Sequence, residues 1–252
     1  MQKRVSILNG AFDALTTTET VDRIFRAINA GERGWLCTVN VATLVMMRNN
    51  VELQCFVDGA LFVVADGQPL VWCAPIFGGH LPERVAGIDL IDTLCARAEI
   101  EGKAVFLLGA TTPIVRRAVL GLRRRYPKLR VDGADGYFTE SAADNRAKQI
   151  RESGAELLFV GMGSPLQEAF IKNHWNDLGV GIAIGVGGSL DVIAGERFRA
   201  PPWVRAIGLE WLVRAAQEPR RLMPRYLSAH PKFCLLIANA AMNRLKRRWI
   251  IN

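Results

Sequence analysis

The sequence predicts an α/β protein in which a Rossmann-like, mainly parallel sheet is flanked by helices and followed by a helical, basic C-terminal appendage. Short apolar and β-branched runs alternate with amphipathic segments over most of the 252 residues, a pattern typical of strands joined by helices. The runs 157–160 and 180–186 are apolar throughout, as central parallel strands are. From Pro201 onward the pattern contains two or three helical segments and no strand.

In the first half of the chain, three apolar runs predict strands at residues 5–8, 35–39 and 61–65. The helical patterns of this half cover residues 17–30, 41–48, 51–56 and 88–98. The first of these helices is expected to begin at a threonine cap, Thr17 or Thr18, and to stop at Gly31. The segment 77–87 is rich in glycine and proline, which predicts a mobile loop of the kind that often covers an active site.

In the second half, strands are expected at residues 105–108, 129–131, 157–160 and 180–186. Thr111 is a suitable helix cap with Pro113 in the first turn, and this helix is expected to reach Tyr126. Ser141 and Asp144 fit a capping arrangement for the next helix.

The charge is distributed unevenly along the chain. Residues 1–195 contain 20 Lys and Arg against 21 Asp and Glu, whereas residues 196–252 contain 12 against 3. The formal net charge of +8 therefore comes entirely from the tail. We predict an α/β catalytic core over 1–195 and a helical appendage over 196–252 that meets an anionic partner: a bilayer surface, a nucleic acid or a diphosphate.

The composition excludes several classes of protein. We find neither a signal-peptide core nor a run of about 20 apolar residues, so secretion and membrane spanning are disfavoured and a cytoplasmic location is expected. The five cysteines are scattered without a C-x-x-C pair, which indicates core residues in a reducing compartment and no disulfides. The three histidines lack the spacing of metal ligands.

A glycine-containing turn follows the strand at 157–160 and opens a helix. Its backbone N–H groups, between Gly161 and Gln167, could hold a phosphate at the helix start. An alternative needs no ligand, because Ser164 and Gln167 match a capping box with Pro165 at the first turn. A dinucleotide-dependent oxidoreductase is less favoured, because the next strand ends without an acid that could hold a ribose.

Polar residues also follow two other predicted strands. Asp66 comes after the strand at 61–65, where a carboxylate could act as a general base, and Thr38 and Asn40 end the strand at 35–39. Each could also be a simple turn former. In a parallel sheet, however, these three residues and the turn at Gly161 lie on one edge, and this convergence favours a site.

The tail offers cations to such a site. Arg214, Arg221 and Arg225 lie roughly on one helical face if the helix continues through its prolines, although a solvated basic face is the ordinary alternative. Further on, the apolar run 233–241 precedes four basic residues and Trp249, which suits a helix lying in a membrane interface. Four basic residues near an anionic leaflet contribute about 4 kcal/mol.

Eight short motifs resemble those of the WecG/TagA/CpsF glycosyltransferases, in that family's order and across almost the whole chain. They are Thr38-Val-Asn40, Ala65-Asp66-Gly67-Gln68-Pro69, the run from Glu83 to Leu90, the run from Gly161 to Glu168, Gly187-Gly188-Ser-Leu-Asp191, Ala194-Gly195, Arg199-Ala200-Pro201 and Gly208-Leu209-Glu210-Trp211. The resemblance implies an inverting enzyme that transfers a sugar from a UDP-sugar to a saccharide on a polyprenyl diphosphate. It also implies a peripheral location at the inner face of a bacterial membrane, in the synthesis of a cell-surface polysaccharide.

The same resemblance assigns roles to residues. Asp66 is the expected base, with Thr38 and Asn40 beside it. The residues expected to bind substrate are Arg84, Gly161, Gly163, Gln167, Gly187, Asp191, Arg214, Arg221 and Arg225, of which the three tail arginines close over the site.

No cofactor and no essential metal are expected, because the chain contains no Asp-x-Asp pair and arginines with a helix start can neutralise a diphosphate instead. The donor sugar stays open among N-acetylmannosamine, its uronic acid and glucose, and association into a homo-oligomer also stays open. A nucleic-acid-binding protein that uses the basic tail is the alternative from another class. It is disfavoured because the body is near neutral and the tail lacks a recognition motif.

Overall fold

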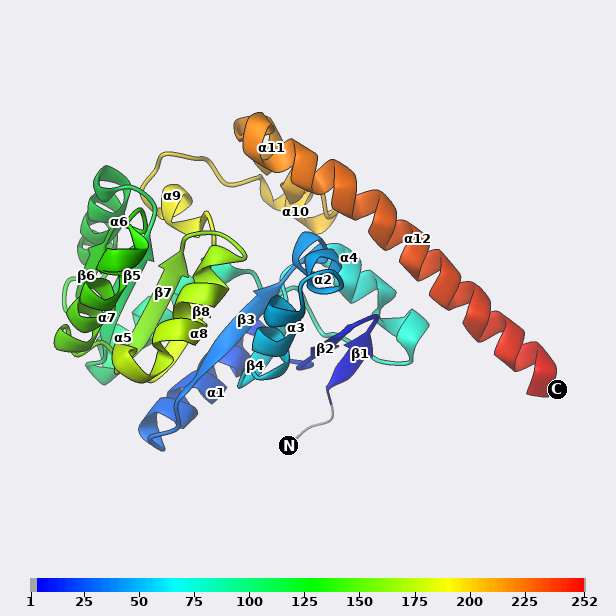
Figure 1. Cartoon of the computed structure of the whole chain (residues 1–252), viewed down its shortest axis with the longest axis horizontal. Coiled ribbons are helices and arrows are strands. Elements are labelled where there is room, and N and C mark those ends of the chain that lie inside the picture. The colour runs from blue at the N-terminus through cyan, green and yellow to red at the C-terminus, as the bar shows by residue number, and fades with distance from the viewer. Residues whose placement is uncertain (1–3, 252) are drawn as a thin grey trace.

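The structure is a computed structural model that describes residues 4–251, with side chains described for residues 4–244. Its centre is a six-stranded parallel sheet with the strand order β4-β3-β8-β7-β5-β6 (Figure 1). The strands are β3 (Gly34–Val39), β4 (Phe62–Ala65), β5 (Ala104–Gly109), β6 (Arg130–Ala134), β7 (Leu157–Gly161) and β8 (Ile182–Gly185). The predicted parallel α/β sheet is confirmed, and the carboxyl ends of all six strands lie at one edge.

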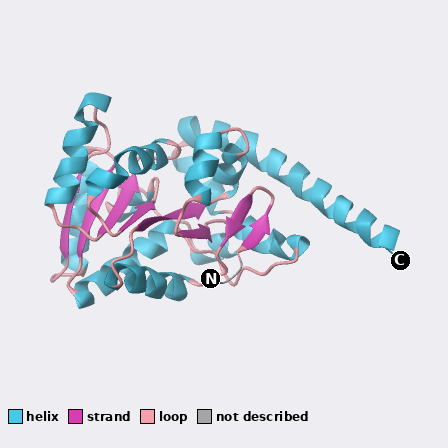
Figure 2. Ribbon diagram, turned by 60° about the horizontal axis from the view of Figure 1, so that its bottom comes forward, coloured by secondary structure: helices cyan, strands magenta, loops and turns pink. Residues whose placement is uncertain are grey.

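Helices cover both faces of the sheet, and two apolar cores form between the layers (Figure 2). One core involves α2 (Val41–Met47), α3 (Val51–Asp58), α7 (Ala143–Glu152) and α8 (Leu166–Leu178). The other involves α1 (Thr17–Asn29), α5 (Gly87–Glu101), α6 (Thr112–Arg125) and α9 (Ser189–Ile193). Successive strand side chains point to opposite faces, so Leu158 and Val160 enter the first core while Leu157 and Phe159 enter the second. This double burial explains why these runs are apolar throughout.

Several local predictions need correction. The run at 5–8 does form β1 (Val5–Ile7), but β1 pairs antiparallel with β2 (Gly10–Phe12) in a separate two-stranded sheet. Thr16 caps α1 in a capping box with Glu19, so the predicted caps one and two residues later were wrong. Ser141 and Asp144 do not cap α7, because Ser141 lies in the turn η2 (Glu140–Ala142) and the cap position has no side-chain hydrogen bond.

The loop predicted at 77–87 is shorter than expected. Two short helices, α4 (Gln68–Cys73) and η1 (Ala74–Phe77), precede it, and α5 already begins at Gly87. All five cysteines are free, but Cys55 and Cys234 are exposed rather than in the core.

The tail is helical, as predicted, and consists of α10 (Pro202–Ala206), α11 (Glu210–Gln217) and α12 (Pro219–Ile251). The inner face of α12 packs on α2, α11 and η1 through residues spaced by three or four: Leu222, Tyr226, Ala229, Phe233 and Ile237. The helix continues through two prolines and extends past the body of the molecule (Figures 1 and 2). The division at residue 195 into a core and a membrane-associating appendage stays a prediction. Among the described helices, none combines the length and the apolar composition that crossing a bilayer would take.

Candidate active site

A cleft opens at the carboxyl edge of the sheet, between the core and the C-terminal helices. Its empty volume is about 550 Å³, including the part open to solvent. The core contributes the start of α2 and the turn between β4 and α4, while α11 and α12 form the other side. The lining includes Asn40, Asp66, Gln68, Pro69, Arg84, Glu210, Trp211, Arg214, Tyr226 and His230. The acid after β4 and an arginine of the tail thus face one cavity.

Asp66 stands at the end of β4, where its backbone N–H donates to the carbonyl of Val39 at 2.9 Å. Its carboxylate lies 3.7 Å from Nε of Arg84 and accepts a long hydrogen bond of 3.5 Å from the N–H of Gly87. Burial raises the pKa of Asp66, and the guanidinium groups of Arg84 and Arg214 offset this only in part. A carboxylate with a raised pKa is a stronger base, which suits proton abstraction.

Arg84 is shared between the core and the tail. Its Nη2 lies 2.6 Å from Glu210 at the start of α11, and its Nε faces Asp66. Burial alone would lower the pKa of Arg84, but the carboxylates of Asp66 and Glu210 outweigh that effect and raise it. This permanently charged side chain therefore ties the loop before α5 to α11 and helps to fix the orientation of Asp66.

The two polar residues that follow β3 are placed differently. Asn40 lines the cleft, and its side-chain oxygen caps α2 by accepting from the N–H of Thr43 at 3.0 Å. Thr38 is not part of the cleft lining, because its hydroxyl donates to the carbonyl of Gly185 at 3.0 Å across β3 and β8. The sheet edge brings Asp66 and Asn40 together, and Thr38 supports the neighbouring strand.

The turn after β7 is organised by Gln167, and the capping box considered as an alternative there does not form. Pro165 occupies the cap position without a side-chain hydrogen bond. The buried side chain of Gln167 accepts from the N–H of Gly163 at 3.2 Å and from the N–H of Gly187 at 3.0 Å. Gly185 leaves the space for this side chain, since a Cβ there would lie 2.4 Å from the amide nitrogen of Gln167.

Gln167 thus links the turns that follow β7 and β8. Gly163 and Gly187 both have positive φ angles, of 81° and 51°, and the positions of their missing side chains face open space. Gly161 ends β7 and is closely packed, because a Cβ there would meet Leu190 at 2.8 Å. The two open glycines therefore allow a ligand to approach the backbone.

Three charged side chains gather around Gly188, which precedes α9. A Cβ at Gly188 would lie 3.4 Å from Nη2 of Arg214 and 3.5 Å from both Nη2 of Arg221 and Oδ2 of Asp191. The tail therefore carries two guanidinium groups to the turn after β8, where an anion could bind.

Arg225 lies within electrostatic range of these two arginines but has a different hydrogen-bond partner. Its Nη2 donates to the hydroxyl of Thr43 at 3.3 Å, and its Nε is buried without a hydrogen-bond partner. Burial lowers the pKa of Arg225, while the carboxylate of Glu168 partly offsets that effect. Arg225 therefore contacts α2 through Thr43, and the predicted role of the three tail arginines in binding substrate stays a prediction.

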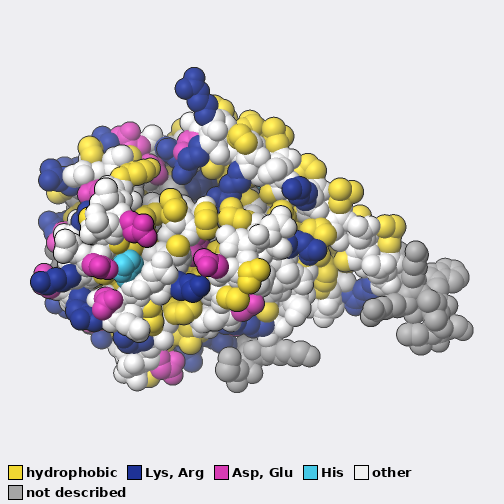
Figure 3. Space-filling view, viewed as in Figure 1, with side chains coloured by type: hydrophobic (Ala, Val, Ile, Leu, Met, Phe, Trp, Pro, Cys, Tyr) yellow, Lys and Arg dark blue, Asp and Glu magenta, His cyan; other side chains and the backbone are white. Residues whose placement is uncertain are grey.

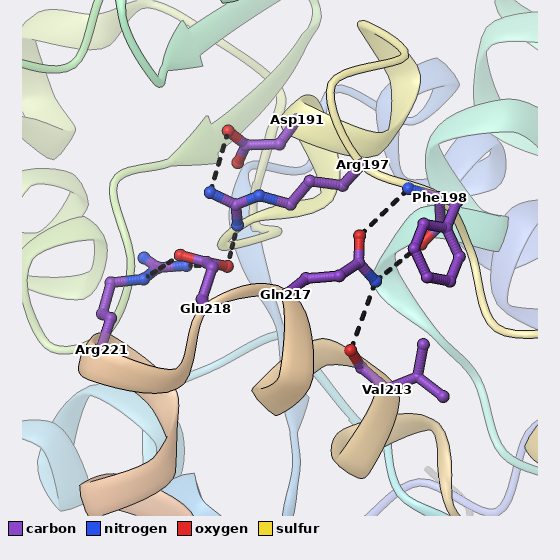
Figure 4. A network of polar contacts seen from close by, with 7 residues as sticks. All are labelled: Asp191, Arg197, Phe198, Val213, Gln217, Glu218 and Arg221. Atoms are coloured by element: carbon purple, nitrogen blue, oxygen red, sulfur yellow. Dashed lines mark hydrogen bonds and ion pairs between the residues drawn. The ribbon is translucent and has the colours of Figure 1, made fainter.

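A further arginine, Arg197, joins the cluster from the segment after α9 (Figure 4). It forms an ion pair with Glu218, which also holds Arg221 at 2.5 and 2.8 Å, and it lies 3.8 Å from Asp191. Beside it, the side chain of Gln217 bonds both backbone groups of Phe198, at 3.2 and 3.1 Å. These contacts fasten the junction of α11 and α12 to the core.

Glu218→Gln is expected to loosen this junction, because the largely buried pair with Arg197 loses its charge. Amide hydrogen exchange in residues 210–217 should become about tenfold faster, since hydrogen bonds to charged groups stabilise by about 1.5–3 kcal/mol. Glu196→Gln is the matched control. Glu196 directly precedes Arg197 in the sequence but pairs with Arg117 at the surface. Equal exchange in wild type and Glu218→Gln would show that the junction is held by other contacts.

Sequence reasoning missed Glu210, Arg197 and Glu218 as parts of the site. The partners of Glu210 and Arg197 come from distant segments, whereas the spacing of Glu218 and Arg221 by three residues was a local signal that could have indicated their pair. Among the described residues, no group of three or more His, Cys, Asp or Glu side chains is arranged to hold a metal ion.

A parallel α/β sheet with a carboxylate at its carboxyl edge and a facing arginine cluster has the arrangement of a group-transfer site that could bind an anion. A sequence model of the glycosyl transferase WecG/TagA/CpsF family matches residues 5–247, and the chain belongs to this family. The protein is a glycosyltransferase, which confirms the family and the enzyme class expected from the sequence.

Similar curated proteins come from Staphylococcus aureus. The proteins of strains MW2 and NCTC 8325 are each 32% identical to this chain over 239 residues, covering 94% of this chain and 93% of the relative. Both are named N-acetylglucosaminyldiphosphoundecaprenol N-acetyl-beta-D-mannosaminyltransferase. The similarity extends over nearly the full length of both partners.

Proposed function

We propose that the protein is an inverting glycosyltransferase that moves a sugar from a UDP-sugar to N-acetylglucosamine carried on a polyprenyl diphosphate. The names of the S. aureus relatives support this acceptor and favour N-acetylmannosamine as the donor sugar to test first. One observation carries the proposal: Asp66 and Arg214 line the same cleft, with Arg197 and Arg221 close to Arg214.

The proposed reaction is a single displacement. Asp66 takes the proton from the acceptor hydroxyl, and the hydroxyl oxygen forms a bond to the anomeric carbon of the donor sugar. The bond from this carbon to the β-phosphate oxygen breaks, and its electron pair leaves with UDP. Because the hydroxyl attacks opposite the leaving group, the configuration at the anomeric carbon inverts.

The arginine cluster is proposed to stabilise the leaving group. Arg214, Arg221 and Arg197 neutralise charge as it develops on the diphosphate, which lowers the barrier more than it strengthens ground-state binding. Gly163 and Gly187 are proposed to allow the nucleotide to lie close to the backbone of the two turns. Arg84 and Glu210 are proposed to keep Asp66 oriented toward the acceptor.

The experiment that tests the function is a transfer assay with a short-chain, water-soluble analogue of N-acetylglucosaminyl diphosphate lipid. UDP-N-acetylmannosamine, its uronic acid form and UDP-glucose are compared as donors. We expect UDP release that depends on the acceptor, together with a disaccharide product of inverted configuration. Binding of all three donors without any transfer to this acceptor would contradict the proposed function.

We also propose that the protein lies on the inner face of the cell membrane through the outer face of α12. Leu227, Leu235 and Met242 share that face at intervals of seven or eight residues and are 64%, 66% and 51% exposed. Hydrophobic side chains spread along α12 in Figure 3. Lys232 adds positive charge on the same helix. The side chains of Lys246, Arg247, Arg248 and Trp249, which the sequence also suggested for this contact, lie outside those that the structure describes.

The double variant Leu227→Asp with Leu235→Asp is expected to bind anionic vesicles at least about tenfold more weakly than wild type, because each change removes an apolar contact and adds repulsion. Vesicle flotation measures this binding. Leu120→Asp is the control, because Leu120 is 50% exposed but lies on α6, on the core. If wild type and the double variant float equally, the outer face of α12 is not the membrane contact.

A further inference from the structure

Three aromatic side chains of the tail form one wall of the cleft that contains Asp66. Trp211 comes from α11, and Tyr226 and His230 come from α12. The rings of Trp211 and His230 stack with centroids 4.4 Å apart and planes 29° apart. Tyr226 meets both rings edge-on, at 5.6 and 5.4 Å. The result is a continuous aromatic surface next to the candidate base.

The rings of this aromatic surface are held in fixed orientations and are not fully buried. Nδ1 of His230 lies 2.9 Å from the backbone carbonyl of Tyr226 one turn earlier, which fixes the orientation of the imidazole. All three rings are only partly buried, whereas Leu222, Ala229 and Phe233 on the same tail are fully inside. Tyr226 also packs on the apolar core, but its ring, like those of Trp211 and His230, lines the cleft and is accessible to a ligand there.

The opposite wall of the cleft is mainly polar. It presents the side chains of Asn40, Asp66 and Gln68, with Pro69 beside them. A slot with one aromatic wall and one hydrogen-bonding wall matches a pyranose ring, whose C–H groups pack on aromatic faces while its hydroxyls need polar partners.

The position of the arginine cluster indicates whether this slot binds the donor sugar or the acceptor sugar. A second cavity lies on the α9 side of Asp66, is lined by Ser189, Val192 and Phe198, and shares Arg214 with the cleft. Gly188, around which Arg214, Arg221 and Asp191 gather, directly precedes Ser189 of this second cavity, so we assign the donor diphosphate to that side. Asp66 borders both cavities, which places the base between the donor and whatever fills the aromatic slot.

We propose that Trp211, backed by Tyr226 and His230, is the platform on which the sugar ring of the acceptor stacks. This inference rests on the proposed function, because it assumes a saccharide acceptor. It goes further by assigning the acceptor to the α11–α12 side of Asp66 and the donor to the α9 side.

The test compares Trp211→Leu with Trp203→Leu in the soluble transfer assay. Leucine keeps an apolar side chain at Trp211 but removes the ring face, whereas Trp203 is 69% exposed on α10 and does not line the cleft. We expect Trp211→Leu to raise the KM for the acceptor by about two- to tenfold, the effect of losing one aromatic contact of this kind. The KM for the donor, the affinity for UDP and slow transfer of the sugar to water should stay unchanged.

Trp211→Phe provides a second measurement, because it keeps a smaller ring and should raise the acceptor KM by a smaller factor. An unchanged acceptor KM in both variants, or a loss of UDP affinity together with kcat, would overturn the platform and leave Trp211 as an anchor of the tail. These outcomes differ from failure of the proposed function, in which wild type itself transfers nothing to the acceptor and the platform is refuted with it.

Discussion

Asp66→Asn is expected to lower kcat for sugar transfer by about 10²–10⁴-fold, because an amide cannot accept the proton of the acceptor hydroxyl. The fold should be retained, since the amide has nearly the same shape and its oxygen can still accept the 3.5 Å hydrogen bond from Gly87. Affinity for UDP, measured by calorimetry, should also be retained. Asp58→Asn is the matched control, because Asp58 is an exposed acid at the end of α3.

The pH dependence gives an independent check on the same residue. Burial raises the pKa of Asp66, so kcat/KM should fall as the pH drops through a value above the usual aspartate range. Glu210→Gln removes a negative charge that raises this pKa, and should move the acidic limb of the profile to lower pH. Arg84→Gln removes a positive charge that lowers it, and should move the limb to higher pH. Full activity in Asp66→Asn, or limbs that do not move, would remove Asp66 as the base.

Arg214→Ala and Arg221→Ala are each expected to lower kcat by about 10²–10³-fold, the usual effect of losing one group that stabilises developing negative charge. The donor KM should change less than kcat, because the diphosphate gains charge only as the sugar leaves. Single-turnover kinetics with the UDP-sugar separates the two effects.

Arg220→Ala is a close control for these variants. Arg220 is exposed, precedes Arg221 in α12 and loses the same charge on substitution, yet does not approach Gly188 in the way that Arg214 and Arg221 do. It should keep wild-type kinetics with a soluble acceptor. If all three variants lose activity equally, the effect is one of overall charge rather than of contact with the leaving group.

The sheet could be predicted from the sequence because its strands are buried on both faces. Leu157–Gly161 is apolar at every position before its glycine, and such a run allows few other interpretations. The hairpin of β1 and β2 was missed because each strand has only three residues, too few to show a period of two. The order of the strands in the sheet could not be predicted from the sequence either, since it depends on contacts between distant segments.

The candidate site was predictable where a residue follows a strand, as Asp66 does, and where a family motif covers it. The ion pairs of Arg84 with Glu210 and of Arg197 with Glu218 could not be read from local patterns, because tertiary packing brings the partners together. Tyr226 and His230 share a helical spacing that more often indicates core packing, and Trp211 lies on a different helix. Only the geometry shows that these rings border an empty cleft.

The order of the cleft residues along the sequence determines when the proposed active site is complete during synthesis of the chain. The base comes from residue 66, whereas the guanidinium groups and the aromatic wall come from residues 197–230 and are fastened by the contacts of Glu218 and Gln217. A nascent chain that has completed only the parallel sheet holds the carboxylate without its electrophilic partners. On the proposed mechanism such a ribosome-bound intermediate lacks the groups that stabilise the leaving group, so we expect turnover only after the last helices have emerged and docked.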